Sequence, residues 1–157
     1  MSETDRQKQM IIDHLNSVFY GEAWHGAALL PTIRELDAEE AIRKNTEGHS
    51  VWGVALHCAY WKFAILRKLA VDGESPQFDR SPDDFPELPD PADADAFQAD
   101  IAFLEAEHRA LIDAIAAFPA GRLGDPAPDL PMDYAGMILG GACHDAYHAA
   151  HIRNLGA

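Results

Sequence analysis

The sequence predicts an all-α protein built as a four-helix bundle. Three observations support this fold class. Apolar residues recur at helical spacing in four long stretches, and no stretch alternates apolar and polar residues as a half-buried strand would. Two of the connections between the stretches are long and rich in proline and glycine, which favours loops. A length of 157 residues suits one domain, so a single domain over residues 1–157 is expected.

The first predicted helix ends at Gly21. After an interruption over residues 21–26, helical character continues over residues 27–36. Asp37, with Glu40 three residues later, has the pattern of a capping box and predicts a short helical turn. The apolar face of the first helix consists of Met10, Ile11, Leu15, Val18 and Phe19.

The second long helix is predicted over residues 50–69 and is apolar on almost every side. A helix of this kind belongs at the centre of a bundle, because few of its side chains are suited to water. Trp52 and Trp61 are therefore assigned to the core. Asp72 and Gly73 are expected to mark the end of the helix.

Residues 73–91 contain five prolines and many acidic residues with little periodicity, which predicts a connecting loop. Asp90, Pro91 and Asp93 predict the start of the third long helix. Proline suits the first helical position, and acidic side chains favour the positive end of the helix dipole. The helix is expected to continue to about Phe118.

A second connection, residues 119–131, leads into the fourth long helix, predicted over residues 133–154. Gly140 and Gly141 lie one turn before His144 in this helix. Their missing side chains either leave room for water or a substrate or reflect helix packing, and the sequence favours neither. The apolar stripe consists of Met137, Ile138, Ala142 and Ile152.

The composition excludes several classes of function. A formal net charge of −14 would repel a phosphate backbone, so nucleic acid is not an expected partner. No apolar run approaches the roughly 20 residues that span a bilayer, and no basic and apolar leader is visible, so no membrane is expected and the location is predicted to be cytoplasmic. Cys58 and Cys143 lie in apolar helical stretches and are predicted to be reduced, buried thiols.

Three histidines point to a metal site. His144 and His148 are four residues apart in one predicted helix, so both imidazoles project from one face and could share an ion. His57 lies among apolar residues of the second long helix, where an unpartnered imidazole would be costly to bury. The sequence thus favours a divalent metal ion, zinc or nickel first, bound by this trio. The alternative is three ordinary histidines hydrogen-bonded to neighbours.

Three segments resemble the DinB-like family of metal-binding four-helix bundles, which includes the YfiT-type proteins. They are Gly21 to Gly26 (GEAWHG), His49 to Trp61 (HSVWGVALHCAYW) and Gly140 to Leu155 (GGACHDAYHAAHIRNL). The resemblance covers almost the whole chain and implies a bundle of the DinB-like type. It also implies that one histidine of the second helix and two of the last bind the metal, which transfers to the same trio.

The sequence departs from the family after the last expected ligand, where Ala150 and His151 replace a common Gly-Gln pair. His151 shares a face with the two neighbouring histidines, so it either orients a ligand or bonds at the helix end. Asp145 is expected to pair with a cation. His25 remains a candidate for a fourth ligand or a proton carrier. Trp24 and Tyr147 are assigned to packing.

Three imidazoles with an open fourth position are typical of a catalytic metal centre. The resemblance implies a thiol transferase that acts on a small molecule, with a low-molecular-weight thiol as cosubstrate. A metal-dependent hydrolase and a non-enzymatic metal-binding or stress-related module are the alternatives. No carboxylate near the trio can be assigned as a general base, which disfavours the hydrolase, and catalytic residues stay unassigned. Relatives often dimerise, so a homodimer is expected.

Overall fold

The computed structural model describes residues 2–70 and 77–155. Within these ranges every long element is an α-helix and there is no strand, apart from one isolated antiparallel bridge between Pro126 and Asp133. The all-α prediction is therefore confirmed. None of the described helices combines the length and the apolar character needed to cross a membrane.

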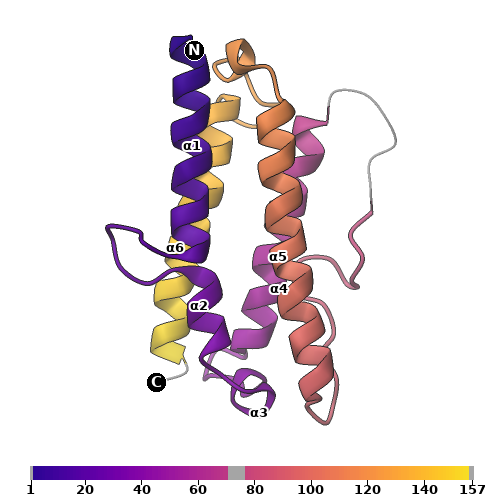
Figure 1. Cartoon of the computed structure of the whole chain (residues 1–157). Coiled ribbons are helices and arrows are strands. Elements are labelled where there is room, and N and C mark those ends of the chain that lie inside the picture. The colour runs from indigo at the N-terminus through magenta and orange to yellow at the C-terminus, as the bar shows by residue number, and fades with distance from the viewer. Residues whose placement is uncertain (1, 71–76, 156–157) are drawn as a thin grey trace.

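Four long helices form the bundle (Figure 1). They are α1 (Glu3–Tyr20), α4 (Val51–Leu69), α5 (Ala94–Ala117) and α6 (Tyr134–Leu155). In the orientation of Figure 1, α1 and α6 run downward while α4 and α5 run upward. Around the bundle, α1 packs against α6, α6 against α4, α4 against α5, and α5 against α1. The contact between α4 and α6 is the one that builds the candidate site.

The ends of these helices follow local chemistry. Gly21 caps the end of α1 as predicted, and the Ser50 side chain accepts a hydrogen bond from the Gly53 amide at the start of α4. The Asp133 carboxylate accepts one from the Gly136 amide at the start of α6, at 2.7 Å. These caps satisfy amides that the helix leaves without partners, so they define the starts of the helices.

Short helical pieces connect α1 to α4. The predicted helical stretch 27–36 is shorter in the structure, where α2 spans Leu29–Arg34. The predicted capping box is confirmed at α3 (Ala38–Ala41), with both of its reciprocal hydrogen bonds present. Between α5 and α6 the chain forms one 3₁₀ turn, η1 (Ala120–Arg122).

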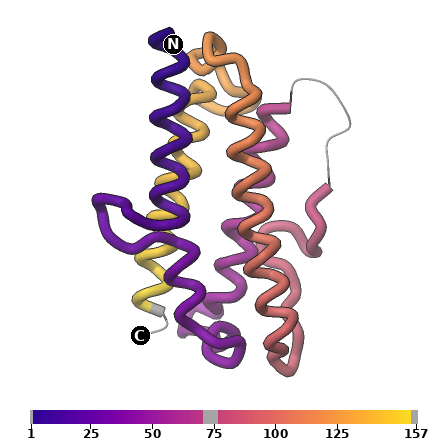
Figure 2. Tube along the Cα trace, in the orientation of Figure 1, coloured from indigo at the N-terminus to yellow at the C-terminus, as the bar shows by residue number. Residues whose placement is uncertain are grey.

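The start of α5 differs from the prediction in the position of Pro91. Asp93 is the N-cap, and its carboxylate accepts a hydrogen bond from the Ala96 amide at 2.7 Å. Pro91 therefore precedes the helix and does not occupy its first position. The predicted stop at Asp72 and Gly73 lies outside the described residues. Figure 2 shows residues 77–93 returning along the bundle to its lower end, where α5 begins.

A layer of polar side chains crosses the middle of the bundle and separates two apolar clusters. On α6 the cluster nearer the helix start ends at Ala142, and the other begins at Ala149. The layer takes one residue from each long helix, and Lys62 and Asp145 form a buried ion pair within it. Its members are Asn16, Lys62, His108 and Asp145.

Four residues assigned to packing are exposed. Trp52 is fully buried as predicted, but Trp61 is 43% exposed and Trp24 is fully exposed. Tyr147 is 66% exposed, and Met10, on the predicted apolar face of α1, is 70% exposed. Met10, Trp61 and Tyr147 lie on helices, where periodicity alone does not decide which side chain at the edge of an apolar face turns inward, whereas Trp24 lies in the turn between α1 and α2.

Candidate metal centre

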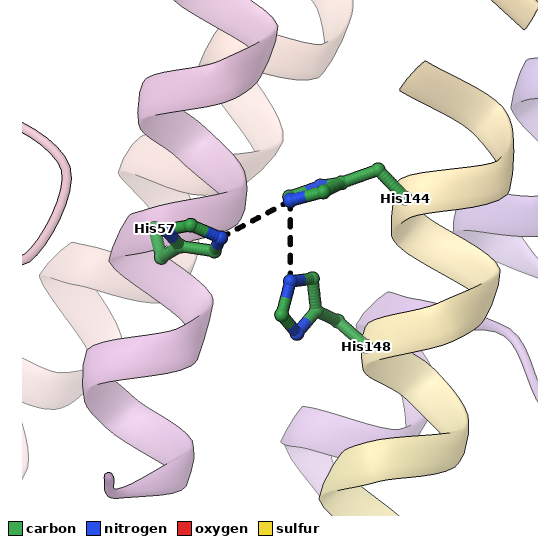
Figure 3. A group of neighbouring side chains, drawn as sticks. All are labelled: His57, His144 and His148. Carbon is green, nitrogen blue, oxygen red and sulfur yellow. Dashed lines mark hydrogen bonds between the residues drawn. The ribbon is translucent and has the colours of Figure 1, made fainter. Parts of the chain in front are cut away.

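The contact between α4 and α6 brings the three predicted histidines together. His57 projects from α4, and His144 and His148 project from successive turns of α6 (Figure 3). The Nε2 atom of His144 lies 3.1 Å from Nε2 of His57 and 3.1 Å from Nε2 of His148. Each ring offers a nitrogen within 4.8 Å of the other two. Three imidazole nitrogens thus converge on one point between the helices.

Asp84 determines the tautomer of His57. Its Oδ1 atom accepts a hydrogen bond from Nδ1 of His57 at 2.5 Å and another from the Trp61 indole at 3.0 Å. A neutral imidazole that donates from Nδ1 has a lone pair on Nε2. That lone pair faces His144 (Figure 3). A carboxylate behind a histidine in this way is the common support of a metal-binding imidazole.

The convergence is not well explained by hydrogen bonds within the trio. The Nε2 atom of His144 is one donor or one acceptor, so it cannot form a full hydrogen bond to both neighbours. A cation would satisfy all three lone pairs. Ligands about 2 Å from a tetrahedral ion are roughly 3.3 Å apart, close to the two separations found here. The geometry and the donor set therefore fit a divalent ion such as zinc or nickel.

The surroundings keep the three imidazoles neutral. Burial, followed by the positive charges that His148 and His57 would carry, lowers the pKa of His144 to about 3. Burial lowers the pKa of His148 to about 4. Burial also lowers the pKa of His57, although the Asp84 carboxylate opposes this. Neutral imidazole is the form that binds metals, so no proton has to be displaced at neutral pH.

The loop before α5 also covers one face of His57. The Phe85 ring stacks on His57 with centroids 4.5 Å apart and planes at 18°, and His49 lies 5.1 Å from Phe85. Sequence reasoning missed Asp84 and Phe85, because residues 77–93 have no periodicity from which to infer a facing direction. The only available clue was the dense run of acidic and aromatic residues.

The other candidate histidines are outside the trio. His25 is exposed and belongs to no group of described side chains that could hold an ion. The His151 ring lies 6.0 Å from that of His148, and its buried Nδ1 has no hydrogen-bond partner within the described part of the chain. Neither predicted role of His151, orienting a ligand or bonding at the helix end, is supported by a contact.

The two cysteines differ in their exposure to solvent. Cys58 is buried as predicted, whereas Cys143 is exposed, which corrects its assignment. Cys58 also lies near the site, in a second group with His144 and Asp145 whose ligand atoms are within 4.8 Å of one another. Burial, and then the Asp145 charge, raise the Cys58 pKa well above its usual value, so the thiol stays protonated. Asp145 pairs with Lys62, as expected for a residue predicted to pair with a cation.

The two glycines before His144 have different roles. A Cβ at Gly141 would lie 2.7 Å from the terminal methyl of Ile65, so this glycine allows α4 and α6 to approach. A Cβ at Gly140 would meet nothing within 4 Å. Gly140 borders a hollow of about 220 Å³ whose wall includes His144. Gly141 thus serves helix packing, and whether the space beside Gly140 takes water or a substrate stays a prediction.

Comparison with known proteins supports one family. A family model described as the DinB superfamily matches residues 23–152, which is most of the chain. The search of curated proteins and the search of solved structures each returned no match.

Proposed function

Because the chain belongs to the DinB superfamily, we propose that it binds a divalent ion, zinc or nickel, through His57, His144 and His148 and transfers a low-molecular-weight thiol to a small molecule. The observation that carries the proposal is the pair of 3.1 Å contacts at Nε2 of His144, which three neutral imidazoles cannot satisfy among themselves.

The residues around the trio have separate tasks in this proposal. The Asp84 carboxylate orients His57 and keeps its proton on Nδ1. Phe85 covers the outer face of the same ring and limits the approach of water. A divalent ion held by the trio supplies Lewis acidity, which lowers the pKa of a thiol or water molecule bound to it. The three protein ligands leave a position for such a molecule.

The carboxylates near the trio are all engaged, which favours thiol transfer over hydrolysis. Asp84 is engaged by His57 and Trp61, and Asp145 is engaged by Lys62. Neither is free to take a proton from an attacking water molecule. Thiol transfer needs no such base, because a thiol bound to a divalent ion is deprotonated outright, whereas bound water keeps a pKa of about 7. The sulfur–carbon bond forms as the bond from carbon to the leaving group breaks, and the thiol proton passes to solvent.

The first experiment measures metal content. We expect the protein to retain about one zinc or nickel ion per chain after loading and desalting, and His57→Ala, His144→Ala and His148→Ala to lose most of it. His25→Ala is the matched control, because His25 is exposed and outside the trio. Circular dichroism should show that all four variants keep their helices. Unchanged metal content in the three trio variants would rule out the site.

The second experiment separates the classes of function. We expect the metal-loaded protein to consume glutathione or cysteine with 1-chloro-2,4-dinitrobenzene as electrophile, and His144→Ala or chelation to abolish this reaction. Cleavage of 4-nitrophenyl acetate without any thiol would instead support a hydrolase. A protein that retains its metal and does neither would be a metal-binding module.

A further inference from the structure

A hollow of about 220 Å³ lies beside the trio, between α4, α6 and the segment that leads into α6. His144 forms part of its wall. Trp61 also borders the hollow, and its ring centroid lies 6.2 Å from that of His144 and 6.3 Å from that of His57. A molecule in the hollow would therefore lie next to His144, the member of the trio whose Nε2 atom is 3.1 Å from both of the others.

The side chains around the hollow favour a neutral occupant over an ionised one. Lys68 is the one charged side chain among the described residues of its wall. Its ammonium group donates to the Pro128 carbonyl at 2.8 Å and lies 3.8 Å from the Asp129 carboxylate. The cation is already engaged, and a buried charge without a partner is unfavourable. Apart from the His144 imidazole, the remaining wall is aliphatic, aromatic and thioether in character, which suits a neutral apolar group.

The shape of the hollow favours a small molecule over another protein surface. Trp61 and Met132 border it while each remains 43% exposed, so a ligand there would shield apolar surface from water. The floor at Gly140 is open, since a Cβ there would meet nothing within 4 Å. A stable protein interface buries about 800 Å² on each partner, far more than a hollow of this volume provides.

We propose that this hollow binds the apolar part of the substrate, a small neutral molecule with an aromatic or aliphatic group, and presents its reacting end to the trio. The proposal rests on the proposed function for the identity of the site next to it. The hollow itself does not depend on a metal, because its wall is formed by residues of α4, α6 and the preceding segment.

The first test uses metal-free protein and the neutral fluorescent probe N-phenyl-1-naphthylamine. We expect saturable binding at micromolar concentration, weakened at least tenfold in Gly140→Leu, whose side chain would fill the hollow. Ala150→Leu is the matched control, since it places the same leucine side chain at an exposed position of α6. Met132→Glu, in the exposed segment, serves as a second variant and should also weaken binding.

Equal probe affinity in the wild type, Gly140→Leu and Met132→Glu would overturn the proposal, and so would the absence of binding. Binding that disappears as the chain self-associates at higher concentration would also overturn it, because a second copy would then be the occupant. If the trio holds no metal while the probe still binds as expected, the proposed function fails and the hollow remains an apolar ligand site.

The second test links the hollow to the trio in cobalt-loaded protein, with the visible spectrum as the readout. We expect benzyl mercaptan to bind at least tenfold more tightly than 2-mercaptoethanol in the wild type and in Ala150→Leu. Gly140→Leu should lose this preference, so that it binds the two thiols with similar affinity. The same preference in all three proteins would show that the apolar group lies elsewhere and would overturn the proposal.

Discussion

Asp84 shows how one loop residue can orient a candidate metal ligand on a helix. Its backbone adopts a left-handed conformation with φ of 71°, which aspartate tolerates better than most residues do. From there its carboxylate reaches both His57 and Trp61. The contact orients His57 and also connects the trio to the wall of the apolar hollow through Trp61.

Removing this carboxylate should weaken metal binding. Asp84→Gly keeps the left-handed backbone free of strain and deletes the hydrogen-bond acceptor, so we expect the affinity for zinc to fall about tenfold or more. Asp84→Asn keeps a neutral acceptor and should lose less. Competition with a chromophoric chelator measures both. Asp83→Gly is the control, because Asp83 is the exposed neighbour, and an Asp84→Gly affinity equal to that of this control would contradict the role.

Within α6, Gly140 and Gly141 allow a comparison inside a single helix turn. Gly140→Ala should raise the free energy of unfolding by about 0.5–1 kcal/mol, because alanine favours the helix and its Cβ would meet nothing. Gly141→Ala gains the same propensity but must displace the Ile65 methyl group, so we expect it to be about 1 kcal/mol less stable than Gly140→Ala. Urea unfolding measures both, and equal stabilities would refute the close approach of α4 and α6.

The ion pair between Lys62 and Asp145 links α4 to α6 next to His144. Lys62→Met should lower the free energy of unfolding by about 3–5 kcal/mol, because it leaves a buried carboxyl group without its partner. The double variant Lys62→Met/Asp145→Leu should recover most of this loss, since two apolar side chains then replace the pair. Urea unfolding of the metal-free proteins is the measurement. A double variant no more stable than the single one would show that the pair is not the cause.

At the scale of the whole molecule, the polar layer of Asn16, Lys62, His108 and Asp145 takes one side chain from each of the four long helices. His108 of α5 is fully buried, donates from Nε2 to the Asn16 side chain at 3.0 Å, and stacks on Phe19 with ring centroids 3.9 Å apart. The Lys62 ammonium group lies 4.8 Å from the centre of the same Phe19 ring. The layer divides the core into the two apolar clusters, and we expect it to favour the packing register in which its four residues lie side by side.

The layer also predicts how stability depends on pH. Burial, followed by the Lys62 charge, lowers the pKa of His108 to about 2. The unfolded chain takes up a proton near pH 6.5, which the folded chain does not take up until about pH 2. The stability that depends on neutral His108 is therefore fully present above pH 6.5 and is lost as the pH falls below that value. From pH 7 to 4.5, His108 should account for about 2.5 kcal/mol of that loss.

His108→Gln tests this by removing the titrating group while an amide can still bond to Asn16. We expect the difference in free energy of unfolding between pH 7 and pH 4.5 to be about 2.5 kcal/mol smaller in this variant than in the wild type. Urea unfolding at both pH values provides the measurement, with the metal-free proteins compared. If the free energy of unfolding changes by the same amount between pH 7 and pH 4.5 in both proteins, His108 is not held neutral by the fold.

Local chemistry was enough to predict most of the secondary structure. Gly21 ends α1, the capping box at Asp37 and Glu40 is present, and α4 and α6 begin within one residue of their predicted starts. Caps and helical periodicity act over a few residues, so they can be read directly from the chain. The pairing of His144 with His148 was predictable for the same reason, because four residues in a helix bring two side chains to one face.

Contacts between distant segments were decided only by the tertiary structure. The sequence by itself determined the all-α class, the family resemblance and the trio of candidate ligands, all of which follow from short-range spacing or from recognisable segments. Packing decided that Asp84 and Phe85 lie on His57, that Lys62 pairs with Asp145, and that Trp61 borders an apolar hollow. An aperiodic loop carries no preferred face, so its contacts depend on how the helices around it pack, which is a property of the whole chain.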